Sequence, residues 1–417
     1  MTSLQPLKKT LIATTIALSA SQLYAAGFQL NAQSATGLGR AFAGDGVIGD
    51  NASVIARNPA AMSLFKQPAL SVGFETITTD IEVKDSTYSG LGGTANADTN
   101  SVGDTSLVPN FYYIQPINDK FAWGFSAYSN FGTKTEFSDD YAGKEYGGKT
   151  DVKSLNLGLV GSYKITPAVS LGAGLDAIYG KGTFTRPDTA YSGGRDVLDI
   201  EADGWALGWN VGAMYEVNKN HRFGFDYHYS PEIEADGDVY RFNPSAPTAT
   251  AIEDTVLMPL PDMAEFSGYH RLSPKYAIHY SIQFIEWSEF DTLKAEKTGN
   301  IKEYSWQDAW HYAIGGTYYM NDAWELRAGY MYDTSAQDQV RSIAVPDSDR
   351  QWLSAGFTYK PDDVSSIDFG ATYLLGEDVN VTENTPNPGN PSTNVSSING
   401  TTHANAILLG LQYSRSF

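Results

Sequence analysis

Apolar and polar residues alternate in short segments along most of the chain. Between Trp324 and Asp333 every second residue is apolar, and a period of two recurs from Arg222, Tyr276 and Ile367. This period is typical of a β-strand whose two faces meet different surroundings. About fourteen such segments occur, and none reaches the roughly 18 uninterrupted apolar residues that a membrane helix needs. Their expected starts are Ala69, Leu107, Phe121, Leu155, Val169, Trp205, Arg222, Ala264, Tyr276, Trp310, Trp324, Gln351, Ile367 and Ala404.

The connections between the segments alternate between short turns and long, polar, acidic loops. Short turns are expected at residues 116–119, 166–167, 218–220, 273–274 and 321–322. In bacterial outer-membrane barrels the strand number is even, short turns face the periplasm and long loops face the outside. The last segment ends on Phe417 after apolar residues at alternate positions, as final strands of such barrels do. The pattern predicts an all-β fold, a 14-stranded antiparallel transmembrane β-barrel over residues 67–417.

A soluble β-sandwich or propeller would also show alternation. A soluble sheet of this size is expected to contain continuous apolar core segments, however, which this chain lacks. The mean hydropathy of −0.29 by itself would suit a soluble protein. The 26 Tyr, 19 Phe and 8 Trp, together with 40 Gly, favour a barrel.

The first 25 residues have the layout of a secretory signal peptide. Lys8 and Lys9 precede an apolar stretch at 11–20, and Ala25 supplies a small residue for cleavage. Cleavage would leave Ala26 as the first mature residue. The signal and the barrel pattern together predict a multi-pass protein of the outer membrane of a Gram-negative bacterium.

Charge and composition exclude several functions. The formal net charge is −20, and loss of the first 25 residues, which hold two Lys and no acid, would make it −22. Such a protein is not expected to bind nucleic acid, because phosphates attract basic surfaces. No cysteine is present, and none of the six histidines has a metal-ligand spacing or lies beside a nucleophile motif. No metal, cofactor or catalytic residue is therefore expected, and the protein is not predicted to be an enzyme.

Residues 26–66 fit neither a helical nor a strand pattern. They lie between the signal and the first predicted strand, with glycines at positions 27, 37, 39, 44, 46 and 49. An irregular segment placed before a barrel wall is most simply a plug in its lumen. We therefore expect a signal peptide at 1–25, an N-terminal hatch at 26–66 and the barrel at 67–417.

Motifs in this segment resemble the start of a known family. Residues 26–30 (AGFQL), 37–41 (GLGRA) and 58–60 (NPA) are similar to the FadL family of outer-membrane long-chain fatty acid transporters. The similarity continues in order through 108–110, 116–119, 129–132, 208–210, 267–269 and 352–356. It implies a monomeric 14-stranded barrel, blocked by a hatch and surrounded by lipopolysaccharide and outer-membrane lipid. It also implies that the partners are long-chain fatty acids or other hydrophobic small molecules.

The resemblance implies a basic pair that meets the ligand carboxylate, and the matching positions are Arg186 and Lys302. The alternation along its strand independently places Arg186 on the lumen side, where a guanidinium can hold a carboxylate through two hydrogen bonds. The alternative is a salt bridge between Arg186 and a wall acid such as Asp333. The assignment of Lys302 rests on the resemblance alone.

Two apolar features match ligand-contacting parts of the family. Phe28 corresponds to an N-terminal aromatic residue that reaches into the ligand pocket, although it could also be a simple anchor. The long loop at 230–262 contains the run VLMPLP, in which Leu257, Met258 and Leu260 resemble an exposed outer site of ligand capture. The alternative is that this run is the packed core of the loop.

The third predicted strand, from Phe121, loses its alternation at residues 128–132. In the family this strand kinks inward and leaves a hole in the wall, and a bulge would explain the broken pattern. An ordinary strand end running into a loop is the alternative. The residues assigned to gating and lateral exit are Asn58, Pro59, Ala60, Ser129, Asn130, Phe131 and Gly132.

The sequence therefore favours passive uptake of long-chain fatty acids and related hydrophobic compounds. The expected steps are capture at the outer loops, carboxylate binding in the lumen, movement of the hatch and lateral exit at the kinked strand. A transporter of neutral aromatic hydrocarbons on the same fold is the main alternative. A general porin and an outer-membrane lipase are further alternatives.

Overall fold

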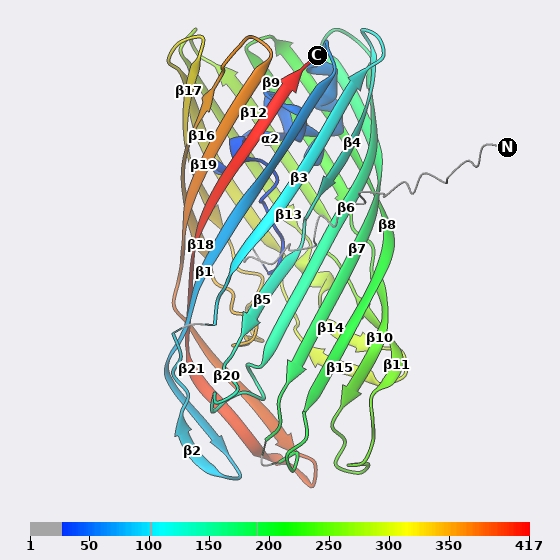
Figure 1. Ribbon diagram of the computed structural model, residues 1–417, viewed down its shortest axis with the longest axis vertical. Helices are drawn as coiled ribbons and strands as arrows, with labels where there is room; N and C mark the ends of the chain where they lie inside the picture. The colour runs from blue at the N-terminus through cyan, green and yellow to red at the C-terminus, as the bar shows by residue number, and fades with distance from the viewer. Residues whose placement is uncertain (1–26, 101, 190) are drawn as a thin grey trace, which may run out of the picture.

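The computed structural model describes residues 27–100, 102–189 and 191–417, so the predicted signal peptide and Ala26 lie outside the described residues. Fourteen long strands form a closed antiparallel ring around a lumen (Figure 1). The ring closes where β1 pairs with both β3 and β21. The wall strands are β1 (Ala69–Gly90), β3 (Thr105–Pro116), β4 (Phe121–Tyr128), β6 (Lys149–Lys164), β7 (Val169–Arg186), β8 (Leu198–Asn218), β9 (His221–Tyr229), β12 (Met263–Arg271), β13 (Tyr276–Ile285), β16 (Ala309–Tyr319), β17 (Trp324–Asp333), β18 (Arg350–Tyr359), β19 (Ser365–Gly376) and β21 (Asn390–Ser416). The predicted fold class is confirmed.

Shorter strands belong to the long loops at one end of the barrel, opposite the short turns (Figure 1). Because long loops face the outside in such barrels, we call this the outer end. These strands are β2 (Gly93–Asn96), β5 (Gly132–Glu136), β10 (Ile233–Arg241), β11 (Ile252–Met258), β14 (Thr292–Ala295), β15 (Gly299–Glu303) and β20 (Val379–Asn387), and a short helix, η3 (Trp287–Glu289), accompanies them.

The two faces of the wall strands differ as the alternation predicts. On β21, Leu409 and Leu411 are exposed toward the lipid side, whereas Leu408 and Gln412 are buried toward the lumen. An apolar outward face suits the bilayer because strand pairing around the ring satisfies most of the backbone groups of the wall. No helix in the described part of the chain has the length and apolar character of a membrane span.

Several strands begin well before the predicted positions. Starts expected at Leu155, Trp205 and Ala404 lie inside β6, β8 and β21, which begin at Lys149, Leu198 and Asn390. Period-two alternation of apolar residues marks the lipid-facing part of a strand. At their outer ends the faces turned away from the lumen carry polar residues, such as Asp199 and Glu201 of β8, so the apolar alternation that marks a lipid-facing strand is absent there.

Residues 27–65 form a luminal segment inside the barrel, toward the end with the short turns (Figure 1). It contains two one-turn α-helices and two 3₁₀ helices. They are α1 (Ala35–Leu38), α2 (Asp45–Ile48), η1 (Ala52–Ala56) and η2 (Pro59–Leu64). Three of these helices, α1, η1 and η2, have a side-chain cap at the N-terminus. The capping side chains accept hydrogen bonds from backbone N–H groups and belong to Ser34, Asn51 and Asn58.

Glycines in the wall let this segment lie directly against the strands. A Cβ atom on Gly329 would overlap the Arg40 carbonyl, and one on Gly370 would overlap the Ala35 carbonyl. On the other side of the barrel, a Cβ on Gly172 would overlap the backbone of Ala60. The lumen is therefore filled by backbone packed on backbone, which leaves little space for a side chain.

We predict that Gly329→Ala loosens the luminal segment and lets ions through, because the added methyl group must displace the Arg40 backbone. The control is Gly316→Ala on the neighbouring strand β16, where the nearest atom to an added Cβ is the Ala277 oxygen at 3.4 Å. Planar-bilayer conductance should rise severalfold for Gly329→Ala only. Equal conductance of the two variants would contradict the packing argument.

Candidate functional site

A pocket of about 290 Å³ opens at the outer end of the lumen. It brings together the two cationic residues that the sequence predicted, Arg186 at the end of β7 and Lys302 on β15. Apolar side chains line the rest of one side, and two acids, Glu145 and Glu383, also reach it. The other lining residues are Tyr146, Phe184, Val197, Leu198, Arg241, Leu293, Ile301, Tyr304, Asn384, Thr385 and Pro386.

Arg186 is buried and bonded only to neutral acceptors. Its guanidinium donates to the carbonyl of Lys149 at 2.7 Å, to the carbonyl of Thr185 at 3.0 Å and to Thr150 Oγ1 at 2.9 Å. No ion pair joins it to a carboxylate in the described parts of the chain, and the suggested partner Asp333 binds Arg350 instead, at 3.1 Å. The alternative of an Arg186–Asp333 salt bridge is therefore wrong. A buried guanidinium without a counter-ion favours an anionic ligand.

Lys302 already has an acidic partner. Its Nζ lies 2.9 Å from Glu383 Oε2 and 2.8 Å from Ser342 Oγ, and it sits 5.5 Å from the centre of the Tyr304 ring. Nearby, burial raises the pKa of Tyr146 to about 12, so this residue presents a neutral phenol to the pocket. The two cations therefore differ: Lys302 forms an ion pair with Glu383, whereas Arg186 forms none among the described residues, although the charge of Glu383 also acts on it.

Further from the outer end than the charged pocket, aromatic and aliphatic side chains close the lumen. A cavity of only about 10 Å³ remains between them, and it shares Phe184 and Tyr304 with the pocket above. This volume is about that of one water-sized probe. A hydrophobic ligand that moves inward from Arg186 must therefore displace side chains.

Phe28 lies at the centre of this apolar cluster and is almost fully buried. Its ring centre is 4.6 Å from that of Trp287, 5.1 Å from Phe290 and 5.5 Å from Trp306. Phe131 of the kinked segment approaches within 6.1 Å. The aromatic partners from the loop at 286–308 were not predicted. The many Trp, Phe and Tyr residues in this loop could have indicated that it packs into the lumen.

The expected exposed capture site in the loop at 230–262 is wrong for this structure. Met258 and Leu260 are buried, and Leu257 is half-buried. Met258 lies on β11 and reaches the small cavity beside Phe28. The VLMPLP run is buried because β11 pairs with both β10 and β14. This pairing directs alternate side chains of β11, such as Val256 and Met258, toward the apolar cluster.

The third wall strand is broken at the predicted place. Three residues, 129–131, separate β4 from β5, whereas two residues of β6 lie between the matching pairs Tyr128↔Asn156 and Gly132↔Lys153. This extra residue is a bulge. On the opposite side, β3 pairs with β4 only from Phe111 onward, so its part at 105–110 pairs with β1 alone. We call this gap between β3 and the 129–131 segment the wall opening.

The luminal segment supplies the partners that the kinked strand lacks. Leu30 N–H donates to the Asn130 carbonyl at 2.5 Å, and Gly132 N–H donates to the Phe28 carbonyl at 2.8 Å. Asn130 Oδ1 also accepts from the Gln33 side chain at 2.7 Å. Ser129 and Phe131 bind Ser154 of β6. Backbone groups of the kink are thus paired to the residues that carry Phe28.

Asn58, Pro59 and Ala60 lie away from the kink contacts just described. Asn58 Nδ2 donates to the Ala213 carbonyl of β8 at 3.1 Å, and its Oδ1 accepts from Ala60 N–H at 2.9 Å. Pro59 occupies the first position of η2, where its missing N–H costs nothing. The contacts make this turn an anchor of the luminal segment on the wall.

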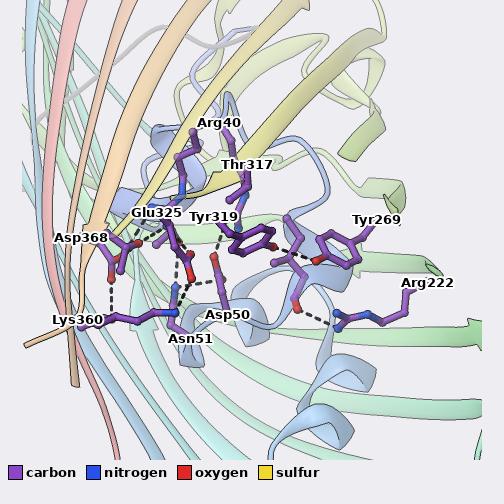
Figure 2. A pocket seen from close by; sticks show the side chains of 15 residues that line it. Arg40, Asp50, Asn51, Arg222, Tyr269, Thr317, Tyr319, Glu325, Lys360 and Asp368 are labelled. Atoms are coloured by element: carbon purple, nitrogen blue, oxygen red, sulfur yellow. Dashed lines mark hydrogen bonds and ion pairs between the residues drawn. The ribbon is translucent and has the colours of Figure 1, made fainter. Parts of the chain in front are cut away.

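A second pocket, of about 240 Å³, lies between the luminal segment and the wall near the short turns (Figure 2). Arg40 binds Asp45 at 2.6 Å and Asp50 at 2.7 Å within the luminal segment. Arg222 donates to the Ile48 carbonyl at 2.9 Å, and Lys360 pairs with Glu325. The polar lining of this pocket contrasts with the apolar cluster around Phe28, which lies nearer the outer end.

Residues 16–417 match the family described as outer membrane protein transport protein (OMPP1/FadL/TodX). The chain belongs to this family. It is 38% identical to the long-chain fatty acid transport protein of Salmonella typhi, over 90% of this chain and 93% of that one. It is 35% identical to outer membrane protein P1 of Haemophilus influenzae, over 98% of this chain and 99% of the relative.

Solved structures share the fold. A Pseudomonas aeruginosa FadL homologue superposes with a TM-score of 0.83 at 22% identity, over 94% of this chain and 100% of that one. The Pseudomonas putida toluene transporter TodX superposes with a TM-score of 0.69 at 16% identity, over 94% and 99%. As a member of the OMPP1/FadL/TodX family, the chain is a transporter of the Gram-negative outer membrane and not an enzyme.

We predict that Phe28→Ala creates a dry cavity lined by Trp287, Phe290 and Trp306, because these rings pack on Phe28 and an apolar cavity stays empty of water. Such a cavity should bind a small apolar molecule. Tryptophan fluorescence titrated with toluene should give at least about tenfold tighter binding than the unmodified protein. The control Phe74→Ala, on the lipid face, should not change the affinity, and no difference between the variants would contradict the prediction.

Proposed function

We propose that the protein carries long-chain fatty acids and related hydrophobic compounds passively across the outer membrane. The observation that carries the proposal is that Phe28, whose ring packs in the apolar cluster, accepts a hydrogen bond through its carbonyl from Gly132 N–H of the kinked strand. The names of relatives that are 37–38% identical, long-chain fatty acid transport proteins, support the choice of ligand. In this proposal residues 26–66 act as a hatch and residues 67–417 as a monomeric barrel surrounded by lipopolysaccharide and lipid.

Binding begins at the outer pocket. The carboxylate of the ligand replaces the neutral acceptors of Arg186 and lies near Lys302, while the tail enters between Phe184 and Tyr304. The tail then displaces Phe28 from its aromatic partners. Met258 and Leu260 contact the tail inside the cluster, because the structure buries them there.

Exit follows from the same displacement. When Phe28 moves, the bonds from Leu30 to Asn130 and from Gly132 to Phe28 are weakened, and the kink residues 129–132 can separate from the hatch. The wall opening beside 105–110 of β3 then leads to the lipid. Asn58, Pro59 and Ala60 hold the other end of the hatch on β8 during this movement.

The rival functions fit these residues less well. A transporter tuned to neutral aromatic hydrocarbons, such as the similar toluene transporter, has no need of an uncompensated buried arginine. A general porin needs a continuous aqueous path, whereas packed side chains leave only a cavity of about 10 Å³ beside Phe28.

We predict that Arg186→Ala weakens binding of oleate to the purified protein about 10- to 100-fold. Hydrogen bonds to charged groups contribute about 1.5–3 kcal/mol, which corresponds to this range. Fluorescence displacement of a bound fatty-acid analogue would measure it. The matched control is Arg341→Ala, which removes an arginine of another outer loop that donates only to backbone carbonyls. An equal effect of both variants, or of neither, would argue against carboxylate binding at Arg186.

We predict that deletion of Asn130 reduces uptake of oleate by cells at least about tenfold while leaving binding at the outer pocket intact. The deletion leaves two residues between β4 and β5, which matches the two residues of β6 opposite them. The two strands can then run as one and pair with β3 across the opening. Uptake by cells lacking their own transporter would be compared with that of a Gly389 deletion, at an exposed hairpin tip. Normal uptake by the Asn130 deletion would rule out lateral exit at this opening.

A further inference from the structure

A buried carboxyl group without a cation lies beside the wall opening. Glu75 points from β1 into the lumen and is fully buried. One of its oxygens accepts a hydrogen bond from Asn110 Nδ2 at 2.9 Å. Glu75 Oε1 and Asn110 Oδ1 have no partner among the described residues. Two acceptors are therefore left facing the lumen, and unpaired buried acceptors cost free energy until a donor reaches them.

The strand register places this pair at the edge of the wall opening. Glu75 lies opposite Val108, inside the part of β3 that has no partner on the β4 side. Asn110 is the last residue of that part, because pairing with β4 starts at Phe111. A head group that leaves the lumen between β3 and the kinked segment would pass these two side chains.

The surroundings of Glu75 supply no compensating charge. On β3, the titratable neighbour is Tyr112, whose hydroxyl donates to the Gln33 carbonyl of the luminal segment at 2.8 Å. On β21, Glu75 is paired with Gly410, against which Ala35 of the luminal segment packs. No cation of the described residues forms an ion pair with Glu75. The site therefore presents hydrogen-bond acceptors and one carboxyl group to whatever passes.

We propose that Glu75 and Asn110 form an exit station that takes a hydrogen-bond-donating head group, so that a fatty acid passes it only with one proton shared between its carboxyl group and Glu75. This inference rests on the proposed lateral exit. Two ionised carboxylates at hydrogen-bond distance repel each other, and a pair of carboxyl groups in such a site keeps one proton between them. The shared proton can come from Glu75 or from the fatty acid. The passage of the acid therefore does not depend on which of the two carboxyl groups is protonated before they meet.

The proposal fixes the sign of a pH effect. At low pH the pair of carboxyl groups holds its shared proton and the acid passes. As the pH rises, the proton is lost, the two charges repel, and passage slows. A fatty alcohol of the same chain length carries a permanent donor and passes at every pH. With Glu75→Gln, the side-chain amide can donate to a carboxylate, so the ionised acid passes as well.

The test is initial uptake of oleic acid and oleyl alcohol, between about pH 6 and pH 8.5, by cells that lack their own transporter and express each variant. For the unmodified protein, the ratio of acid to alcohol uptake should fall at least about fivefold over this range, whereas Glu75→Gln and Glu75→Val should hold it within about twofold. Asp176→Asn is the matched control, because Asp176 is also a buried luminal acid bonded by an asparagine, Asn210, at 2.6 Å, but on β7 and β8. It should keep the profile of the unmodified protein.

The outcomes separate this inference from the proposed function. Absence of uptake by the unmodified protein would overturn the transport proposal itself. Uptake with a pH-independent acid-to-alcohol ratio in the unmodified protein, or with the same pH profile in the Glu75 variants, would overturn only the exit station. Heat-modifiable migration in gels shows whether each variant has assembled. If both Glu75 variants fail to assemble, a pH-independent ratio in the unmodified protein still overturns the exit station.

Discussion

The structure depends on the rule that backbone groups inside a membrane wall must be paired. Around the ring strand pairing meets this rule, but the pairing is interrupted between Tyr128 and Gly132, where the third strand bulges inward. There the luminal segment provides the missing partners through Phe28 and Leu30. The luminal segment and the wall opening are consequently one structural unit, because the luminal segment supplies hydrogen-bond partners to the backbone of the kinked strand.

Different contacts hold different parts of the luminal segment. In its body, Arg57 binds Glu265 of the wall at 3.1 Å, and wall glycines hold the backbone close. Breaking such a buried pair leaves an uncompensated charge, which is strongly unfavourable. Toward the outer end, the Phe28 side chain is held by ring packing, which lacks directional bonds and tolerates replacement by another apolar group. In the proposed function, this side chain is therefore the part of the luminal segment that a ligand displaces most easily.

Features set by local periodicity were predictable from the sequence, whereas features that depend on distant partners were not. The lost alternation after Tyr128 located the bulge, because a strand that changes its inward face must change its pattern. Strand parity likewise placed Arg186 toward the lumen. The partner of Lys302 could not be predicted, since Glu383 comes from a hairpin 81 residues away. The burial of Leu260 was missed because apolar content in a loop does not say whether neighbouring loops cover it.

The closed state of the apolar cluster sets how strongly a tail can be held. Each methylene withdrawn from water contributes about 0.8 kcal/mol, so a tail of about 16 carbons in a preformed cavity would bind too tightly for rapid release. Here the cavity beside Phe28 is only about 10 Å³, so the tail must separate Phe28 from Trp287 and their neighbours before it gains contacts. Aromatic pairs contribute about 0.5–1.5 kcal/mol each beyond the area they bury, and this loss offsets part of the gain. When the tail leaves, the same rings close again, which favours release. In the proposed function, passive transfer is therefore compatible with a deep apolar lumen, because Phe28 and the ligand tail occupy the same site in turn.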